Sequence, residues 1–361
     1  MTTILSVRGL TVRFLMRGRP PVAAVTDVHL DVAAGECLAL VGESGCGKSV
    51  LASALLGLLP ANAEVEGSAV VAGGGTEEGA AARSGRESPA AGEAPEPAAA
   101  ARGAAHSAAG AAADGRVDLI AADERTLART VRGRRVGLVP QSPAAHLTPV
   151  RTVRAHLAES LRELTGTPRA ALDGAVAAAA ERAAFPADHL DRYPHELSGG
   201  LAQRAATALA LVGDAPLLLA DEPTTGLDRD LVDRTADELR RHADAGRALL
   251  LITHDLAAAR RIADRVAVMY AGRIVEIAAA DRFFGTPGPR HPYARGLLAA
   301  LPERDFTPIP GMPPELGALP DGCAFAPRCA HASDVCAGTV PRFTDGAACH
   351  HPQEAQRART P

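Results

Sequence analysis

The stretch Gly42-Glu43-Ser44-Gly45-Cys46-Gly47-Lys48-Ser49 decides the fold, because it fits the pattern G-x-x-x-x-G-K-[ST] at every fixed position. We call it the phosphate loop. It follows the apolar run 37–41 and precedes residues 50–59, whose apolar spacing predicts a helix. In such a unit, backbone N–H groups face a phosphate at a helix N-terminus, where the dipole favours anions. Lys48 is expected to neutralise the β- and γ-phosphates of a nucleotide, and the Ser49 hydroxyl to hold Mg²⁺.

Lysine usage supports this interpretation of the loop. Lys48 is the only lysine among 361 residues, and the other strongly basic side chains are all arginine. A compact ammonium fits a narrow phosphate cradle, whereas a planar guanidinium does not. The alternative, a coincidental glycine-rich turn, accounts for neither the flanking segments nor the lone lysine.

A second apolar run, residues 217–220, ends in Asp221 and Glu222. A parallel strand would deliver both carboxylates to the edge of the sheet where the phosphate loop lies. We expect Asp221 to hold Mg²⁺ through water and Glu222 to act as the base that polarises an attacking water. Taken alone, two acidic residues at a strand end are as readily explained as solvated surface residues as they are by a catalytic role. Beside a phosphate loop they indicate nucleotide hydrolysis.

Length and composition restrict the class of protein. A chain of 361 residues with 47% hydrophobic residues predicts one large domain with an appendage. The net charge of −4 argues against a broad basic face for nucleic acid. The sequence has no uncharged apolar run of about 18 residues and no signal-peptide pattern at its start. We therefore expect a cytoplasmic protein without a membrane span.

The order of apolar segments predicts an α/β fold. Runs 136–139, 216–220 and 248–252 are typical of buried parallel strands, and the alanine-rich stretch 150–185 is typical of helices. Alternation of the two predicts a doubly wound core. Residues 73–115 consist largely of Ala, Gly, Glu, Ser and Pro, which predicts a disordered insertion.

Further motifs resemble those of a known family. Leu197-Ser198-Gly199-Gly200, followed by Gln203-Arg204, resembles the signature motif of ABC ATPases. Gln141 resembles the glutamine of the family's Q-loop, Thr225-Gly226-Leu227-Asp228 resembles its D-loop, and His254 resembles its switch histidine. The resemblance covers nearly the whole chain outside the insertion.

The resemblance implies a P-loop ABC ATPase domain over residues 1–270, with a helical subdomain over 142–196. It implies that ATP and Mg²⁺ are sandwiched between two such domains, and that Ser198, Gly199 and Gly200 meet the γ-phosphate bound by a partner subunit. Catalytic roles follow for Glu222, His254 and Gln141, with Gln141 also near Mg²⁺ and Asp228 near the nucleotide. An upstream aromatic stacks on adenine in the family. Phe14 is the only aromatic before Phe185, although it also suits a core position on a strand.

The C-terminal segment, 271–361, narrows the resemblance. His291-Pro292-Tyr293, Pro310-Gly311-Met312-Pro313-Pro314 and the Cys323-to-Cys329 stretch resemble the tail of the oligopeptide and dipeptide branch of ABC importers, a tail shared with nickel and metallophore importers. Some relatives hold a [4Fe–4S] cluster on the tail cysteines. Zn²⁺ accepts four thiolates equally well, and a site without metal is the third alternative. The cysteines concerned are Cys323, Cys329, Cys336 and Cys349. In the phosphate loop, Lys48 and the local N–H groups are expected to favour the Cys46 thiolate if that thiol is accessible.

The resemblance therefore implies an ATP-hydrolysing subunit of an importer of peptides or similar small solutes, bound peripherally at the cytoplasmic face of the plasma membrane. The partners it implies are a second ATPase subunit, identical or related, and integral membrane permease subunits, with an extracytoplasmic solute-binding protein acting indirectly and no nucleic acid. One alternative is a soluble ABC ATPase that acts on nucleic acid or the ribosome. Such chains usually carry coiled-coil insertions or two fused cassettes, and this sequence has neither. Another alternative is an ATPase regulated through a C-terminal metal or redox centre.

Overall fold

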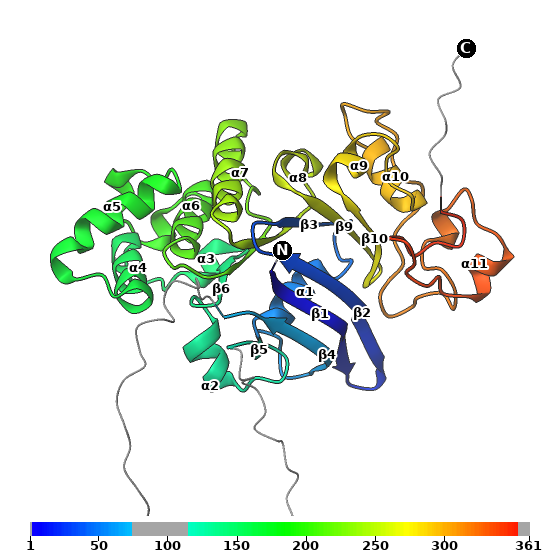
Figure 1. Ribbon diagram of the computed structural model, residues 1–361, viewed down its shortest axis with the longest axis horizontal. Coiled ribbons are helices and arrows are strands. Elements are labelled where there is room, and N and C mark those ends of the chain that lie inside the picture. The colour runs from blue at the N-terminus through cyan, green and yellow to red at the C-terminus, as the bar shows by residue number, and fades with distance from the viewer. Residues whose placement is uncertain (1, 74–114, 353–361) are drawn as a thin grey trace, which may run out of the picture.

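The computed structural model describes residues 2–73 and 115–352, so the predicted disordered insertion lies outside the described residues apart from its two end glycines (Figure 1). Two sheets, one of six strands and one of four, form the centre of the molecule. Within the described ranges, none of the helices combines the length and apolarity needed to cross a membrane.

The six-stranded sheet has the order β10-β9-β3-β8-β7-β6. All neighbouring pairs are parallel except β9 with β10, which is antiparallel. The predicted parallel strands are thus confirmed. The carboxyl ends of β3, β7 and β8 share one edge of the sheet, so the phosphate loop, Asp221-Glu222 and His254 lie at the same edge. The strands are β3 (Cys37–Val41), β6 (Val136–Val139), β7 (Leu217–Asp221), β8 (Ala248–Thr253), β9 (Arg265–Tyr270) and β10 (Arg273–Ala279).

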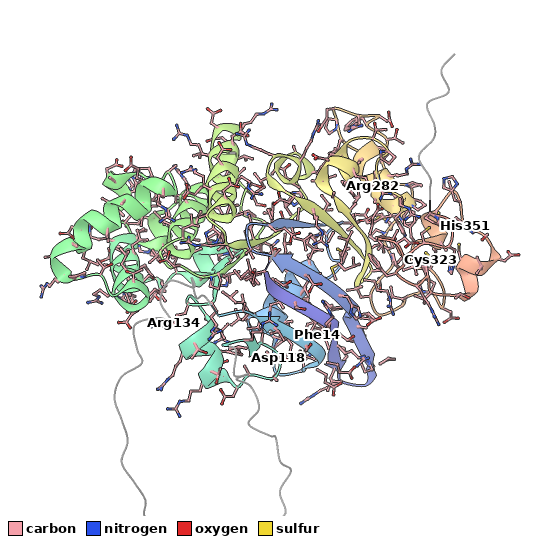
Figure 2. All side chains as sticks on the ribbon, viewed as in Figure 1. Phe14, Asp118, Arg134, Arg282, Cys323 and His351 are labelled. Atoms are coloured by element: carbon pink, nitrogen blue, oxygen red, sulfur yellow. The ribbon has the colours of Figure 1, made fainter. Side chains whose placement is uncertain are left out.

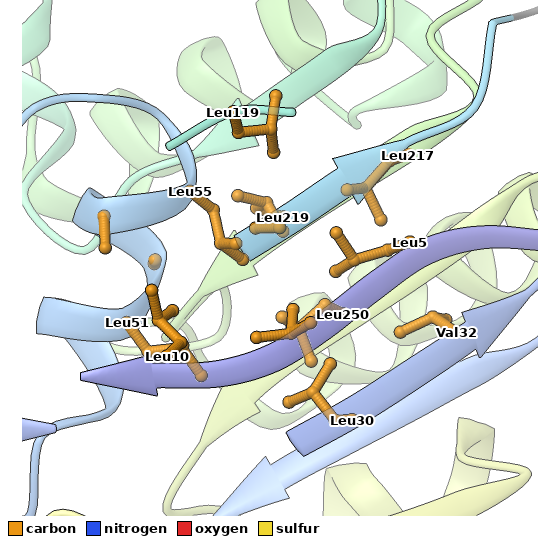
Figure 3. Packing of buried hydrophobic residues seen from close by; sticks show 14 of the residues in the cluster. Leu5, Leu10, Leu30, Val32, Leu51, Leu55, Leu119, Leu217, Leu219 and Leu250 are labelled. Atoms are coloured by element: carbon orange, nitrogen blue, oxygen red, sulfur yellow. The ribbon is translucent and has the colours of Figure 1, made fainter. Parts of the chain in front are cut away.

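Strand β3 is buried on both faces, because alternate side chains enter two different cores. Leu38 and Leu40 face a core shared with the four-stranded sheet and with helix α1 (Lys48–Leu55), and Figure 3 shows Leu51 and Leu55 of that helix in it. Cys37, Ala39 and Val41 face a second core, which is covered by α7 (Arg229–Asp244) and α8 (Leu256–Ile262). The confirmed fold class is therefore α/β, with layers on both faces of the parallel sheet.

The four-stranded sheet is antiparallel, with the order β2-β1-β4-β5. It covers the first core and carries the N-terminal part of the chain (Figure 1). Its strands are β1 (Thr3–Met16), β2 (Arg19–Ala33), β4 (Ala63–Val71) and β5 (Val117–Asp118).

A helical layer lies at one end of the molecule, coloured green in Figure 1. It has its own core, to which Leu157, Val176 and Phe185 contribute. This layer follows β6 and ends in the helix that leads to β7, so it is inserted between two neighbouring strands of the parallel sheet. Its helices are α3 (Pro143–His146), α4 (Val153–Ser160), α5 (Leu172–Arg182) and α6 (Gly199–Ala210). The short helix α2 (Glu124–Thr126) precedes β6 and lies outside this layer.

The chain after Tyr270 first completes the six-stranded sheet through β10 and then forms the segment 280–352, which we call the C-terminal extension. The expected boundary at residue 270 thus falls between two paired strands. The extension packs Tyr293 and Phe325 into the second core, against Tyr270. Its helices are α9 (Ala280–Phe284), α10 (Pro292–Ala299) and α11 (Asp334–Gly338), at the opposite end from the helical layer (Figure 1).

Candidate nucleotide site

The backbone of the phosphate loop requires glycine at its two fixed glycine positions. Gly47 has a φ of 108°, and a Cβ on it would lie 2.3 Å from the carbonyl oxygen of Ala24. Gly42 has a φ of 156°, and a Cβ there would lie 2.3 Å from the carbonyl oxygen of Met269. Any side chain would collide with fixed backbone at both points. Gly47 is also the N-cap of α1, so the loop leads directly into a helix N-terminus without a side chain blocking its N–H groups.

A cavity of about 510 Å³ opens in front of this helix N-terminus. The volume suits a small-molecule ligand. The cavity unites most of the phosphate loop with the predicted Q-loop, base and switch residues, which come from the ends of different strands. Its lining residues are Ser44, Gly45, Gly47, Lys48, Ser49, Val50, Gln141, Glu222, Thr225, His254 and Leu316.

The ammonium of Lys48 lies within the loop itself. Its Nζ donates hydrogen bonds to the carbonyl oxygens of Gly42 (2.7 Å) and Glu43 (3.0 Å), and the residue is only 7% exposed. The positive charge is therefore held at the start of α1, beside free helical N–H groups. Both features favour an anion at this point of the cavity.

Asp221 and Ser49 form a pair of oxygen donors behind the cavity. The carboxyl group of Asp221 is buried, and burial raises its pKa although a hydrogen bond from Ser49 and the charge of Lys48 lower it. Its Oδ1 has no hydrogen-bond partner among the described residues. A buried carboxylate oxygen without a partner, next to a serine hydroxyl, is a donor set that fits Mg²⁺.

Glu222 and His254 form a second pair at the same edge of the sheet. The imidazole Nδ1–H of His254 donates to Glu222 Oε2 at 2.7 Å, and the Glu222 N–H donates to the carbonyl of Ile252 at 2.8 Å. Glu222 is buried and has a φ of 52°, a region that non-glycine residues rarely occupy. Strain of this kind persists only where surrounding contacts impose it, and it is concentrated at functional sites. The His254 side chain remains 68% exposed, so its ring reaches from the carboxylate into the open cavity.

Several predicted nucleotide contacts do not line this cavity. Ser198, Gly199 and Gly200 lie at the start of α6, where Ser198 and Gly199 are exposed. Asp228 caps α7 by accepting a hydrogen bond from the Leu231 N–H (3.0 Å). Phe14 lies on the antiparallel sheet (Figure 2), half-buried against the first core and opposite Val22 of β2. The folded chain therefore separates the phosphate loop from the signature motif.

Three residues of the loop also face away from the cavity. Gly42 is buried behind the loop, and the Glu43 carboxylate is paired with Arg328. The expected Cys46 thiolate depends on an accessible thiol, and this condition is not met, since the side chain is 6% exposed and belongs to the first core. Burial raises the pKa of the Cys46 thiol, and the charge of Lys48 lowers it by less. Cys46 can therefore offer a phosphate only its backbone N–H.

Three lining residues were absent from the predicted site. Val50 and Thr225 directly adjoin predicted residues, since one follows Ser49 and the other opens the D-loop stretch, so their proximity could have been inferred. Leu316 comes from the C-terminal extension, and no local pattern links it to the phosphate loop. Only tertiary packing brings it there.

The four tail cysteines converge elsewhere. Cys323, Cys329, Cys336 and Cys349 line one small cavity in the C-terminal extension, the region where Figure 2 labels Cys323. Backbone N–H groups of His331 and His351 donate to the sulfurs of Cys329 and Cys349, at 3.4 Å each. Burial raises the pKa of Cys349 to about 11, so without a metal this thiol stays protonated. Among the residues that the structure describes, no group of three or more Cys, His, Asp or Glu is arranged to hold a metal ion.

The fold and the cavity define a nucleotide-binding P-loop ATPase. Residues 25–88 and 107–225 match the ABC transporter family, and residues 275–336 match the family described as "Oligopeptide/dipeptide transporter, C-terminal region". The chain belongs to the ABC transporter family, as an ATP-binding subunit that hydrolyses ATP.

Named relatives agree with this assignment, and a solved structure shares the fold. The chain is 37% identical to a protein of Brucella ovis named "Putative peptide import ATP-binding protein", over 94% of this chain and 92% of that protein. It is 34% identical to the dipeptide transport ATP-binding protein DppD of Bacillus subtilis, over 95% and 92% of the two chains. A dimeric ATP-binding cassette solved with ADP and phosphate shares the fold, with a TM-score of 0.59 and 20% identity over 77% of this chain and 99% of that one.

Proposed function

We propose that this chain is the ATP-hydrolysing subunit of an ABC importer that takes up peptides or similar small solutes. The observation that carries the proposal is the union, on one chain, of a nucleotide cavity containing the Glu222–His254 pair with a C-terminal region matching oligopeptide and dipeptide transporters. Relatives named for peptide import and dipeptide transport, similar along almost the whole chain, support the class of solute.

In this proposal, the loop N–H groups and the Lys48 ammonium bind the β- and γ-phosphates of ATP. Lys48 needs only to turn its Nζ from the carbonyls of Gly42 and Glu43 toward the phosphates. Ser49 and Asp221 would hold Mg²⁺, which would supply positive charge against the phosphates. Phe14 supplies the flat apolar surface for adenine, on the sheet that adjoins the loop.

Glu222 accepts a proton from the attacking water in this mechanism. The Nδ1–H···Oε2 bond at 2.7 Å fixes the carboxylate, and the exposed imidazole of His254, which lines the cavity, contacts the γ-phosphate. Gln141, which also lines the cavity, would orient the attacking water and contribute to the Mg²⁺ site. Hydrolysis proceeds by attack of water oxygen on the γ-phosphorus, and the bond to the β–γ bridging oxygen breaks.

The exposed residues of the signature motif form the contact with a second ATPase subunit in this proposal. Ser198, Gly199 and Gly200 contact the γ-phosphate of a nucleotide on a second ATPase subunit, identical or related, and Asp228 lies at the same interface. ATP thereby closes the pair, and integral membrane permease subunits convert closure and release into transport. The pair sits peripherally on the cytoplasmic face of the membrane, and a solute-binding protein acts on the other side.

For the extension, we propose that its four cysteines draw together around a [4Fe–4S] cluster or Zn²⁺, because as described they line one cavity without being arranged to hold a metal ion. Their convergence on one small cavity and the N–H groups donated to two of the sulfurs support this proposal. Iron and sulfide analysis of anaerobically purified protein tests it, with the Cys329→Ser variant as control. Iron with sulfide indicates a cluster, one zinc per chain indicates zinc, and neither element contradicts the proposal.

Uptake by intact cells tests the transport function. Cells lacking this chain are complemented with the parent protein or with Glu222→Gln, and uptake of isotope-labelled trialanine and of ⁶³Ni²⁺ is measured. We expect only the parent protein to restore trialanine uptake. Restoration of nickel uptake alone would replace peptide with metal as the solute. No difference between the two complementing proteins would contradict a transport role.

A further inference from the structure

Glu43, the second residue of the phosphate loop, is held on three sides. Its N–H donates to the Tyr293 hydroxyl at 2.8 Å, and both of its carboxylate oxygens accept from Arg328, at 2.7 and 2.9 Å. Its carbonyl oxygen accepts from Lys48 Nζ at 3.0 Å. Two of the three partners come from the C-terminal extension, 250 and 285 residues further along the chain.

The arginine of this contact is itself fixed. The Arg328 side chain is only 4% exposed. Its Nε donates to the carbonyl of Pro310 at 2.9 Å and its Nη1 to the Tyr270 hydroxyl at 3.3 Å, and its guanidinium lies 5.9 Å from the ring centres of Tyr270 and Phe325. A guanidinium held this way presents a rigid fork to a carboxylate, so the bidentate pair determines where Glu43 sits.

The position of Glu43 matters because of what its other end holds. The carbonyls of Gly42 and Glu43 are the oxygens that hold the Lys48 ammonium inside the loop. If Glu43 were released, its peptide groups could rotate, and both the cradle of N–H groups and the resting place of the ammonium would change. Small displacements of this kind are costly where a site depends on preorganised geometry.

We propose that Arg328 is a positioning residue for the phosphate loop, through which the C-terminal extension sets the affinity of the site for ATP. The proposal rests on the binding of ATP by the loop. Arg328 touches Glu43 and does not line the nucleotide cavity, so its effect is indirect.

A separate contact places the extension beside the same cavity. Leu316 lines it, and a Cβ on the neighbouring Gly317 would lie 3.5 Å from Val22, the residue paired with Phe14. The segment that carries Leu316 begins just after Pro310, whose carbonyl accepts from Arg328. Arg328 therefore links the phosphate loop to the base of a segment that borders the nucleotide.

Affinity for a fluorescent ATP analogue, mant-ATP, tests the proposal on the full chain. Arg328→Gln and Glu43→Gln are each expected to raise Kd about tenfold, and the double variant no further, because both act through one pair. Turnover of Arg328→Gln at saturating ATP should stay within about threefold of the parent, since this residue lies outside the nucleotide cavity and its loss affects binding rather than chemistry. Arg328→Lys should recover part of the affinity, because it restores the charge without the fork.

Arg304 supplies a matched control. It makes a bond within the extension, by donating to the carbonyl of Phe284 at 2.6 Å, and it does not touch the phosphate loop. Arg304→Gln should leave Kd unchanged. An equal rise in Kd for this variant, or an unchanged Kd for both Arg328→Gln and Glu43→Gln, would overturn the proposal. Glu43 is more exposed, at 28% of its side chain, so its variant keeps the test valid if Arg328→Gln does not fold. Failure of the parent protein to bind mant-ATP would instead contradict the nucleotide site itself.

Discussion

Two helices of this molecule, α1 and α6, begin at glycine-rich turns, and their N-termini differ in how far the chain encloses them. At α1, the N-terminus is enclosed: Gly47 has no room for a side chain, Lys48 is buried, and Glu222 and His254 line the same cavity. At α6, Ser198 and Gly199 are exposed, and a Cβ on Gly199 would meet nothing within 4 Å. We infer that one chain contains a complete nucleotide-receiving half and a second half that functions only opposite another subunit.

Removal of the proposed base should give the largest effect. Glu222→Gln keeps the side-chain volume and is expected to lower kcat about 1,000-fold, because it removes the proton acceptor. Its Kd for Mg-ATP should stay within about twofold of the parent. Phosphate release and mant-ATP titration measure the two quantities, with Glu181→Gln, an exposed glutamate on α5, as control. Turnover at the parent rate would show that Glu222 is not the base.

The lone lysine allows a finer test of the α1 half. Lys48→Arg keeps the charge but replaces a compact ammonium with a planar group in a buried position, so kcat/KM should fall about 100-fold. The reverse exchange at an exposed ion pair, Arg13→Lys, should change nothing measurable. If Lys48→Arg retained half of the parent kcat/KM, the shape argument for lysine would be wrong.

The α6 half is tested by a charge at its exposed end. Ser198 caps the helix by accepting from the Leu201 N–H at 3.3 Å, and aspartate caps equally well. Ser198→Asp would set a negative charge against the partner's γ-phosphate, and turnover should fall about 30-fold. Ser198→Asn keeps a cap without the charge and should lose less activity. Equal activities of the aspartate variant and the parent would contradict a phosphate contact at this helix.

Cys46 should give the smallest effect, although it lies within the α1 half. Its thiol is buried and its pKa is raised by burial, so Cys46→Ser should keep kcat/KM within about twofold of the parent. Iodoacetamide should modify Cys46 in denatured protein and leave it unmodified in native protein, as peptide mapping would detect. Rapid modification of native Cys46 that ATP prevents would show that the thiol is accessible, which is the condition under which the sequence favours its thiolate.

The strand ends of the nucleotide site could be predicted from the sequence, whereas the contacts between distant segments could not. Short apolar strands ending in the phosphate loop, in Asp221-Glu222 and before His254 predicted the α/β fold and a shared edge, because parallel strands bring their carboxyl ends together. The inward turn of the Cys46 side chain could not be predicted, because it depends on the loop dihedral angles. The contacts of Tyr293, Leu316 and Arg328 with the loop region were also missed. They join segments separated by more than 200 residues, which no local pattern connects.

Binding of Mg-ATP to the separate variants tests the central claim most directly. The measurement is calorimetric titration of Ser198→Asp and Lys48→Arg as isolated chains, at concentrations where the parent protein is monomeric. If the nucleotide-receiving half is complete in one chain, Ser198→Asp should bind one ATP per chain with the parent's Kd, whereas Lys48→Arg should bind at least tenfold more weakly. Equal losses of affinity in both variants would contradict the division of the molecule into a complete half and a half that requires a partner.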